Sequence, residues 1–375
     1  MLKHLFVDNF RTLVNFNIDL GPLTLLLGPN GAGKSTVLDV IRTLYQFTCE
    51  FGRTDELFPQ TTLTRWQSLK AQTFELGLSG SKGAYVYHLE LDHDLDVQRC
   101  RIKSESLKFG NQLLFESRTV SGQLRAQLYQ DDGSKGMELL AVETISGIAA
   151  LINTRMSDLV DGFWKLIRQV QVCRFDPMQM RARSERETPI LDANASNYAG
   201  WLRHLAASDL EFAGRLRPML EEALEGYEGL TLLPDGQDAR ILKVRFKSGA
   251  NGDPSGRPYE CRFDELSDGQ RVLIVLYSLL SAARQETALC LDEPENFLAL
   301  REIQPWLNAL MDRAQAGDCQ AILVSHHPEL INALAAGHGR WLDRTAGGPT
   351  RCQPITEDGS GLPISELVAR GWLNA

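Results

Sequence analysis

A glycine-rich segment of eight residues constrains the fold of this chain more than any other feature of its sequence. It reads Gly28-Pro29-Asn30-Gly31-Ala32-Gly33-Lys34-Ser35 and matches the pattern G-x-x-x-x-G-K-[ST]. That pattern belongs between a buried strand and a helix. An apolar run at residues 23–27 precedes the segment, and apolar residues with helical spacing follow it. The sequence therefore predicts a strand, a phosphate-binding turn and a helix, in that order.

The residue types in this segment, the glycine loop (residues 28–35), favour phosphate binding. Glycines let backbone N–H groups turn toward phosphate oxygens, and the helix N-terminus adds partial positive charge. We expect Lys34 to reach the β- and γ-phosphates of a nucleotide and Ser35 to ligate Mg²⁺. The alternative is a glycine-rich turn that binds nothing, which the flanking pattern disfavours. The predicted nucleotide-binding residues here are Asn30, Gly31, Ala32, Gly33, Lys34, Ser35 and Thr36.

A second segment, residues 288–295, is an apolar strand that ends in carboxylates. Asp292 at the strand end is predicted to hold Mg²⁺ through water. Glu293 is predicted to orient and deprotonate the attacking water. Acidic residues often end strands, so the prediction depends on the pairing of this segment with the glycine loop. We expect Glu295 to be structural or to lie at a subunit contact.

Two further segments precede and follow these carboxylates. Leu266-Ser267-Asp268-Gly269-Gln270, the signature turn, stands immediately before an apolar helical stretch at residues 270–283. A serine hydroxyl and a glycine N–H at a helix N-terminus form an anion site, and the alternative is an ordinary helix cap. Ser325-His326-His327-Pro328 follows a short buried strand at residues 321–324. An imidazole at a strand end donates well to a phosphate oxygen.

In this order the four motifs resemble those of ABC-type P-loop ATPases, specifically the OLD/RecF/SMC-like group. The signature turn is similar to L-S-G-G-Q, and residues 325–328 are similar to [ST]-H-x-P. The resemblance covers residues 1 to about 50 and about 260 to 335. It implies an α/β fold, a P-loop NTPase head of the ABC type. That head has a mixed or parallel core sheet, an antiparallel β lobe and a helical insertion.

The resemblance also implies roles for single residues. Ser267 and Gly269 of one protomer cap the γ-phosphate held by the other, and His326 senses that phosphate. Asp268 departs from the family pattern, because a carboxylate beside phosphate is unfavourable unless it turns away. Residues 7–11 resemble the N-F-R-[ST] element, which places Arg11 near the nucleotide. The glutamine loop of the family has one candidate, residues 174–179, at even odds with a plain turn.

The implied function is ATP hydrolysis, with ATP and Mg²⁺ as cofactors and Glu293, His326 and Lys34 as catalytic residues. Two protomers form a homodimer around two ATP molecules and couple nucleotide state to a separately encoded effector protein or to DNA. In this family such heads serve DNA repair or anti-phage defence. The alternative is a slow ATP-gated regulatory scaffold with little turnover and no DNA binding. About 45 residues follow Pro328, too few for a nuclease domain, so none is expected in this chain.

The remaining pattern predicts one discontinuous domain over residues 1–375. Residues 1–140 form an N-terminal lobe, with strands at 2–8 and 14–19 and an antiparallel meander over 74–129 that includes a strand at 97–102. Residues 141–230 are mainly helical, over 141–168 and 196–225, without heptads for a long coiled coil. Residues 231–375 form the C-terminal lobe. Its strands at 241–246 and 259–263 are joined by a mobile turn at 248–256.

Composition excludes several other classes. Lys plus Arg is 39 and Asp plus Glu is 48, a net charge of −9, which argues against a non-specific nucleic-acid coat. Seven cysteines without a C-x-x-C pair favour neither zinc nor disulfides and suit the reducing cytoplasm. No apolar run is long enough to span a membrane. Arg174, Arg181, Arg183 and Arg186 could contact DNA, but intervening glutamates favour a solvated, ion-paired loop. His88, Asp92, His93 and Asp94 lack a metal-ligand spacing and are expected to be exposed strand-edge residues.

Overall fold

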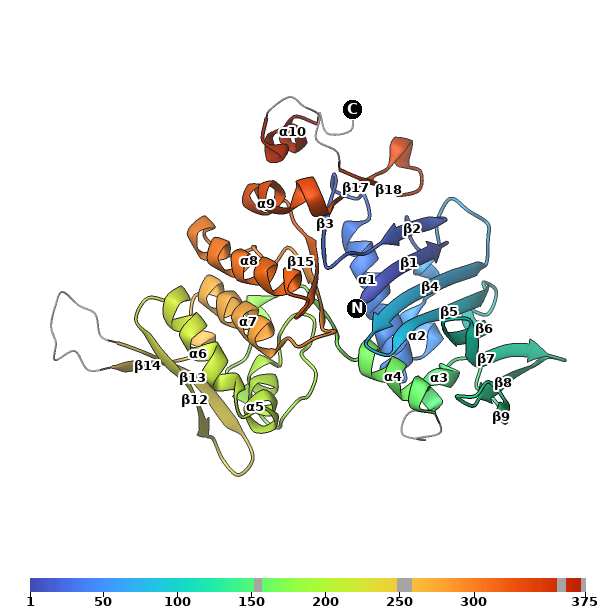
Figure 1. The fold of residues 1–375 in the computed structure, drawn as a ribbon, viewed down its shortest axis with the longest axis horizontal. Coiled ribbons are helices and arrows are strands. Elements are labelled where there is room, and N and C mark those ends of the chain that lie inside the picture. The colour runs from blue at the N-terminus through green and yellow to red at the C-terminus, as the bar shows by residue number, and fades with distance from the viewer. Residues whose placement is uncertain (152–156, 248–257, 356–361, 372–375) are drawn as a thin grey trace.

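The computed structural model describes residues 1–151, 157–247, 258–355 and 362–371. The turn predicted at residues 248–256 lies outside these ranges. Figure 1 shows a central sheet with an antiparallel β lobe on one side and a helical lobe on the other. This is the expected α/β head with a mixed core sheet, so the predicted fold class is confirmed. The division of the chain at residues 140 and 230 stays a prediction.

The core sheet has six strands in the order β10-β15-β16-β3-β17-β18. The first five run parallel, and β18 pairs with β17 in the antiparallel sense. Consecutive residues of β3 face opposite cores: Leu25 and Leu27 face the helical lobe, whereas Leu26 faces the β lobe. Burial on both faces explains why this strand is uniformly apolar. The strands are β3 (Leu23–Leu27), β10 (Val170–Cys173), β15 (Ala288–Asp292), β16 (Gln320–Val324), β17 (Gly339–Asp343) and β18 (Arg351–Pro354).

The β lobe is an eight-stranded antiparallel sheet in the order β2-β1-β4-β5-β6-β7-β8-β9, which confirms the predicted meander. Two predicted starts were wrong: β2 begins at Phe16, and β6 begins at Arg99 because Gln98 adopts φ 53° in the preceding turn. The strands are β1 (Leu2–Asp8), β2 (Phe16–Asp19), β4 (Ala71–Gly80), β5 (Gly83–Asp94), β6 (Arg99–Phe109), β7 (Gln112–Val120), β8 (Gln123–Tyr129) and β9 (Lys135–Leu140). Helices α1 (Lys34–Cys49) and α2 (Thr54–Leu57) accompany this lobe.

One prediction about the middle of the chain was wrong in detail. Residues 141–168 are not continuously helical, because Ser146 and Ser157 each cap a new helix through the side-chain oxygen. The helices are α3 (Gly147–Ala150), α4 (Asp158–Ile167), α5 (Tyr198–Ser208) and α6 (Phe212–Ala223). Three strands also begin within residues 141–230, which were predicted to be mainly helical. The strand β10 forms an edge of the core sheet, and β11 (Arg183–Ser184) and β12 (Tyr227–Pro234) were likewise not expected.

The C-terminal part supplies the helices that cover the core sheet opposite the β lobe (Figure 1). These are α7 (Asp268–Ala282), α8 (Leu300–Gln315), α9 (Pro328–His338) and α10 (Ile364–Arg370). The strands β13 (Arg240–Phe246) and β14 (Tyr259–Arg262) pair as predicted, with β12 on the far side of β13. Single 3₁₀ turns occur at Gln60–Thr62, Pro177–Gln179, Phe263–Glu265 and Thr345–Gly347.

The structure also bears on the predictions about membrane-spanning segments, cysteines and His93. Within the described ranges, no helix is both long and apolar enough to cross a bilayer. All seven cysteines are free thiols. His93 was expected to be exposed, but its side chain is buried against Gln72 Oε1 at 2.9 Å and Cys100 Sγ at 3.6 Å. That prediction was wrong because the helix α2 and its flanks cover this end of β5 and β6.

Candidate nucleotide-binding site

The glycine loop connects β3 to α1, as the motif requires, and its glycines are sterically necessary. Gly28 has φ 144°, and a Cβ there would lie 1.9 Å from the carbonyl oxygen of Leu342. Gly33 is the N-cap of α1 with φ 101°, and a Cβ there would lie within 3 Å of the hydroxyls of Thr350 and Thr12. A side chain at either position would therefore displace the backbone of the glycine loop.

Lys34 folds its ammonium group back onto this loop. Its Nζ donates to the carbonyl oxygens of Gly28 at 2.8 Å and Pro29 at 3.1 Å. Burial lowers the pKa of Lys34, whereas the nearby charges of Glu293 and Asp292 act in the opposite direction. Among the described residues no carboxylate lies within ion-pair distance of the ammonium group, so its charge is available to a phosphate.

The strands β3, β16 and β15 are parallel neighbours, so their carboxyl ends meet at one edge of the sheet. There the Ser35 hydroxyl donates to Asp292 Oδ1 at 3.2 Å. Burial raises the pKa of Asp292, and the Ser35 hydrogen bond and the Arg174 guanidinium at 3.9 Å act against that rise. A serine hydroxyl beside a strand-end carboxylate is an oxygen donor set that suits Mg²⁺.

Glu293 and His326 lie side by side at the same edge. Glu293 has φ 50°, accepts a hydrogen bond from Asn296 Nδ2 at 2.8 Å, and has Oε1 3.9 Å from His326 Nε2. Burial lowers the pKa of His326, and the Lys34 charge lowers it further. His327 instead accepts from the Glu329 N–H with Nδ1 at 3.3 Å, which caps α9. Of the two histidines, His326 is therefore the one that faces the carboxylates.

Glu295 holds the strand end that carries His326. It is buried, and its Oε1 accepts from the Ser325 hydroxyl at 2.5 Å and the His326 N–H at 3.3 Å. Burial raises the pKa of its carboxyl group. These contacts agree with the structural alternative predicted for Glu295.

The signature turn caps α7 and lies outside this cluster. The Ser267 hydroxyl accepts from the Gln270 N–H at 3.2 Å, and the Gln270 side chain returns to the Ser267 N–H. The Asp268 carboxylate turns toward Arg271, 2.5 Å away. A Cβ at Gly269 would lie 2.7 Å from the Phe297 carbonyl oxygen. Within the described ranges Ser267 makes no hydrogen bond to the glycine loop of its own chain.

Arg11 was expected near the nucleotide. Its guanidinium donates to Asp39 on α1 and lies over the Phe10 ring, 5.3 Å from the centroid. In the arginine cluster, Arg183 pairs with Glu185 at 2.8 Å and with Asp235 at 2.7 Å, so the ion-paired alternative holds for Arg183. Among the described residues, Arg181 and Arg186 form no ion pair. Among the described residues, no three metal-ligating side chains lie together.

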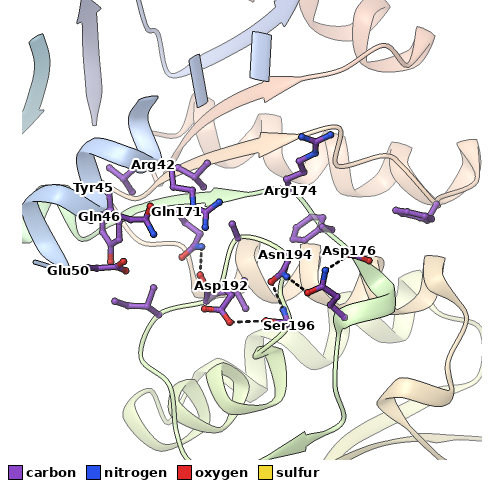
Figure 2. A pocket seen from close by; sticks show the side chains of 18 residues that line it. Arg42, Tyr45, Gln46, Glu50, Gln171, Arg174, Asp176, Asp192, Asn194 and Ser196 are labelled. Atoms are coloured by element: carbon purple, nitrogen blue, oxygen red, sulfur yellow. Dashed lines mark hydrogen bonds between the residues drawn. The ribbon is translucent and has the colours of Figure 1, made fainter. Parts of the chain in front are cut away.

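A cavity of about 720 Å³ lies between α1, β10 and residues 190–196 (Figure 2). Arg42 and Tyr45 come from α1, and Gln171 donates across the gap to the Leu191 carbonyl at 3.0 Å. A smaller cavity of about 200 Å³ is lined by Asp292, Glu293 and Asn296. Arg174, Phe175 and Phe297 line both, so the two spaces adjoin.

The glutamine-loop candidate, residues 174–179, lines the larger cavity and follows β10 directly. Gln179 Nε2 donates to Asp176 Oδ2 at 2.7 Å, and its Oε1 accepts from Asn194 at 2.9 Å. Sequence reasoning missed Asn296 and the approach of Arg174 to Asp292. Proximity to Asp292 in the chain was the only signal for Asn296.

The fold and this edge of the sheet define an α/β P-loop NTPase whose fold is similar to that of an SMC head. A profile of the family described as "AAA domain" matches residues 4–222, more than half of the chain, so the chain belongs to that family. A second profile, described as "AAA domain, putative AbiEii toxin, Type IV TA system", matches residues 185–332.

Individual proteins resemble this chain over a short segment of sequence or in fold. Over 41 residues the chain is 58% identical to the OLD nuclease of Thermus scotoductus. This aligned segment is 11% of this chain and only 8% of that protein. The structure of an Smc head bound to the C-terminal winged-helix domain of ScpA matches with a TM-score of 0.57 and 12% identity, over 94% of this chain and 98% of that one. The SMC head domain of Thermotoga maritima matches with a TM-score of 0.46, 14% identity, and 95% and 99% coverage. The Smc-head likeness is one of fold.

Proposed function

We propose that this chain binds ATP with Mg²⁺ at the glycine loop and hydrolyses it. The observation that carries the proposal is the meeting of Lys34, Ser35 and Asp292 at one sheet edge, with Ser35 Oγ and Asp292 Oδ1 3.2 Å apart. Backbone N–H groups of residues 30–36 cradle the phosphates, and Lys34 exchanges its loop carbonyls for β- and γ-phosphate oxygens. Ser35 and Asp292 hold the metal, directly and through water.

Glu293 is the proposed general base. It orients the attacking water and accepts its proton as the water oxygen bonds to the γ-phosphorus. The bond from the γ-phosphorus to the bridging oxygen breaks, and ADP leaves with that oxygen. His326, 3.9 Å from this carboxylate, donates to the γ-phosphate and stabilises the charge that develops there. Because Glu295 accepts from the backbone N–H of His326, the imidazole stays at the strand end during hydrolysis.

We further propose that ATP joins two copies of the chain. Ser267 and Gly269 of each copy complete the γ-phosphate site of the other. Two features support this. Among the described residues Ser267 makes no hydrogen bond to its own glycine loop, and Phe297, beside Gly269, is 55% exposed, with Leu300 at 50%. Such apolar surface next to a catalytic edge suits an interface that forms only with nucleotide. Loss of the γ-phosphate charge then loosens the pair.

The decisive variant is Glu293→Gln. It should bind ATP with unchanged affinity, lower the hydrolysis rate by about 10²–10⁴-fold, and accumulate dimer by light scattering. Glu211→Gln is the matched control, because the Glu211 side chain is 89% exposed and contacts only its own helix and turn. Hydrolysis at the parental rate by Glu293→Gln would remove Glu293 from its proposed role.

The chain is proposed to act in the cytoplasm in DNA repair or anti-phage defence, by passing its nucleotide state to a separate effector protein or to DNA. The short identity with an OLD nuclease supports this class of process. The free cysteines suit a reducing compartment. Steady-state hydrolysis with and without DNA separates a DNA-coupled ATPase from the slow regulatory scaffold. If DNA binds, the double variant Arg181→Glu/Arg183→Glu should reduce the salt dependence of binding; an unchanged slope would place DNA elsewhere.

A further inference from the structure

The turn that joins β17 to β18, residues 344–350, braces the outer side of the glycine loop. Arg344 Nη1 donates to the Gly31 carbonyl at 3.2 Å, and the Thr350 hydroxyl donates to the Ala32 carbonyl at 2.8 Å. The carbonyl of Leu342, in β17, closes over Gly28. Residues more than 300 positions from the loop therefore hold its backbone.

Arg344 brings a positive charge to this brace. Its other hydrogen bonds among the described residues also go to carbonyls, from Nη2 to Gly347 at 2.6 Å and from Nε to Gly348 at 2.8 Å. Within the described part of the chain no carboxylate lies within 4 Å of this guanidinium, whereas many other arginines have such a partner. A cation held by neutral carbonyls beside a phosphate-binding loop retains its attraction for an anion.

Trp66 lies against this arginine. The Arg344 guanidinium is 5.3 Å from the centroid of the indole, and Trp66 is the most exposed tryptophan among the described residues, at 46%. Its segment is anchored on both sides to Asn9, whose Oδ1 accepts from Thr64 N–H at 3.2 Å and whose Nδ2 donates to the Leu69 carbonyl at 2.9 Å. The indole is therefore an open aromatic surface on a fixed segment, next to the glycine loop.

We propose that Trp66 and Arg344 form the subsite for the nucleoside half of the nucleotide. A purine base stacks on the indole, as bases do on exposed aromatic rings. The Arg344 guanidinium lies between that ring and the Gly31 carbonyl, and its positive charge attracts the first phosphate, next to the sugar. Neither residue belongs to a motif. The pair forms only because two segments that are far apart in the sequence meet in the fold. The inference rests on the proposed ATP binding and adds the part of the site that recognises the base.

The test compares ATP with inorganic tripolyphosphate, which carries the phosphates but no base, by calorimetry on the full chain with Mg²⁺. Trp66→Ala should weaken ATP binding about tenfold, the loss of one base–aromatic stack, and leave tripolyphosphate binding unchanged. Trp66→Phe should restore most of the ATP affinity. Arg344→Ala should weaken both ligands, because it removes charge and the loop contact. Phe51→Ala, at an aromatic residue with 51% exposure beyond the far end of α1, is the control and should change neither.

Intrinsic fluorescence gives a second readout. ATP, but not tripolyphosphate, should quench emission of the unsubstituted chain, and Trp66→Phe should abolish most of that quenching. The subsite is overturned if the unsubstituted chain binds ATP while Trp66→Ala binds it equally well, or if Trp66→Ala weakens both ligands alike. Failure of the unsubstituted chain to bind either ligand would instead refute the proposed ATP binding.

Discussion

The carboxyl edge of the core sheet and the N-terminus of α7 differ in how far one chain completes them. At the sheet edge, residues from three distant segments already lie together, with Ser35 on Asp292 and Glu293 near His326. At α7, the Ser267 hydroxyl is satisfied by its own capping box. The first region holds the polar groups proposed to bind a phosphate and a metal, whereas the second is locally complete. A cap of this kind can still be presented to another molecule, which is the role proposed for it.

The largest effect on ATP affinity is expected from substitution of Lys34, because this residue belongs to the sheet edge and not to α7. Lys34→Ala should weaken ATP binding about 100-fold, since it removes charge-assisted hydrogen bonds to two phosphates. Calorimetry with Mg²⁺ measures the change, and Lys103→Ala is the control, because that side chain only pairs with Glu90 on the β-lobe surface. A Lys34→Ala protein with parental affinity would show that the glycine loop is not the phosphate site.

A smaller and more selective effect is expected at the signature turn. Ser267→Asp keeps a good helix cap but places a carboxylate toward the γ-phosphate of a second copy. In the Glu293→Gln background it should weaken the ATP-dependent dimer at least about tenfold, measured by light scattering against protein concentration. ATP affinity of the separate chain should not change. Equal loss of both properties would mean that Ser267 serves its own nucleotide.

The third effect concerns the fold of the sheet edge. Glu295→Ala leaves the buried Ser325 hydroxyl and the His326 N–H without their partner. The free energy of unfolding should fall by about 2 kcal/mol, measured by urea denaturation. Glu295→Gln retains an acceptor oxygen and should lose less than half of that amount. If the two variants were equally destabilised, the carboxylate charge rather than the hydrogen bonds would hold this strand end.

The smallest effect has the opposite sign. Burial raises the pKa of Asp292 above its ordinary value of 3.8, although Ser35 and Arg174 oppose the rise. The folded chain therefore binds this proton more tightly than the unfolded chain, and the ionised carboxylate lowers stability as pH increases above 3.8. Asp292→Asn should raise the free energy of unfolding by about 1 kcal/mol at pH 7, although the substitution removes a proposed metal ligand and with it the activity. Below about pH 4 the free energy of unfolding should not change. A destabilised Asp292→Asn protein at pH 7 would contradict this balance.

The sheet edge also shows which parts of the site sequence reasoning reaches. The glycine loop, Asp292 and His326 were recognised because their chemistry needs particular residue types next to apolar strands. Asn296, the approach of Arg174 and the Arg344–Trp66 pair were missed, because side-chain contacts across unrelated segments leave no local pattern. The break between α3 and α4 was missed for another reason: serine caps are short signals inside an apolar stretch that still has helical spacing.

By itself, the sequence determined many of the local elements: the apolar strands on either side of the motifs, the turn that only glycines permit, and the order of the motifs. These follow from backbone sterics and from the spacing of apolar residues along a few turns. Only the tertiary structure decided that β16 stands between β3 and β15, and that β17 and β18 brace the glycine loop. Strand order and contacts between distant segments depend on how whole faces bury one another, and no short stretch of chain carries that information.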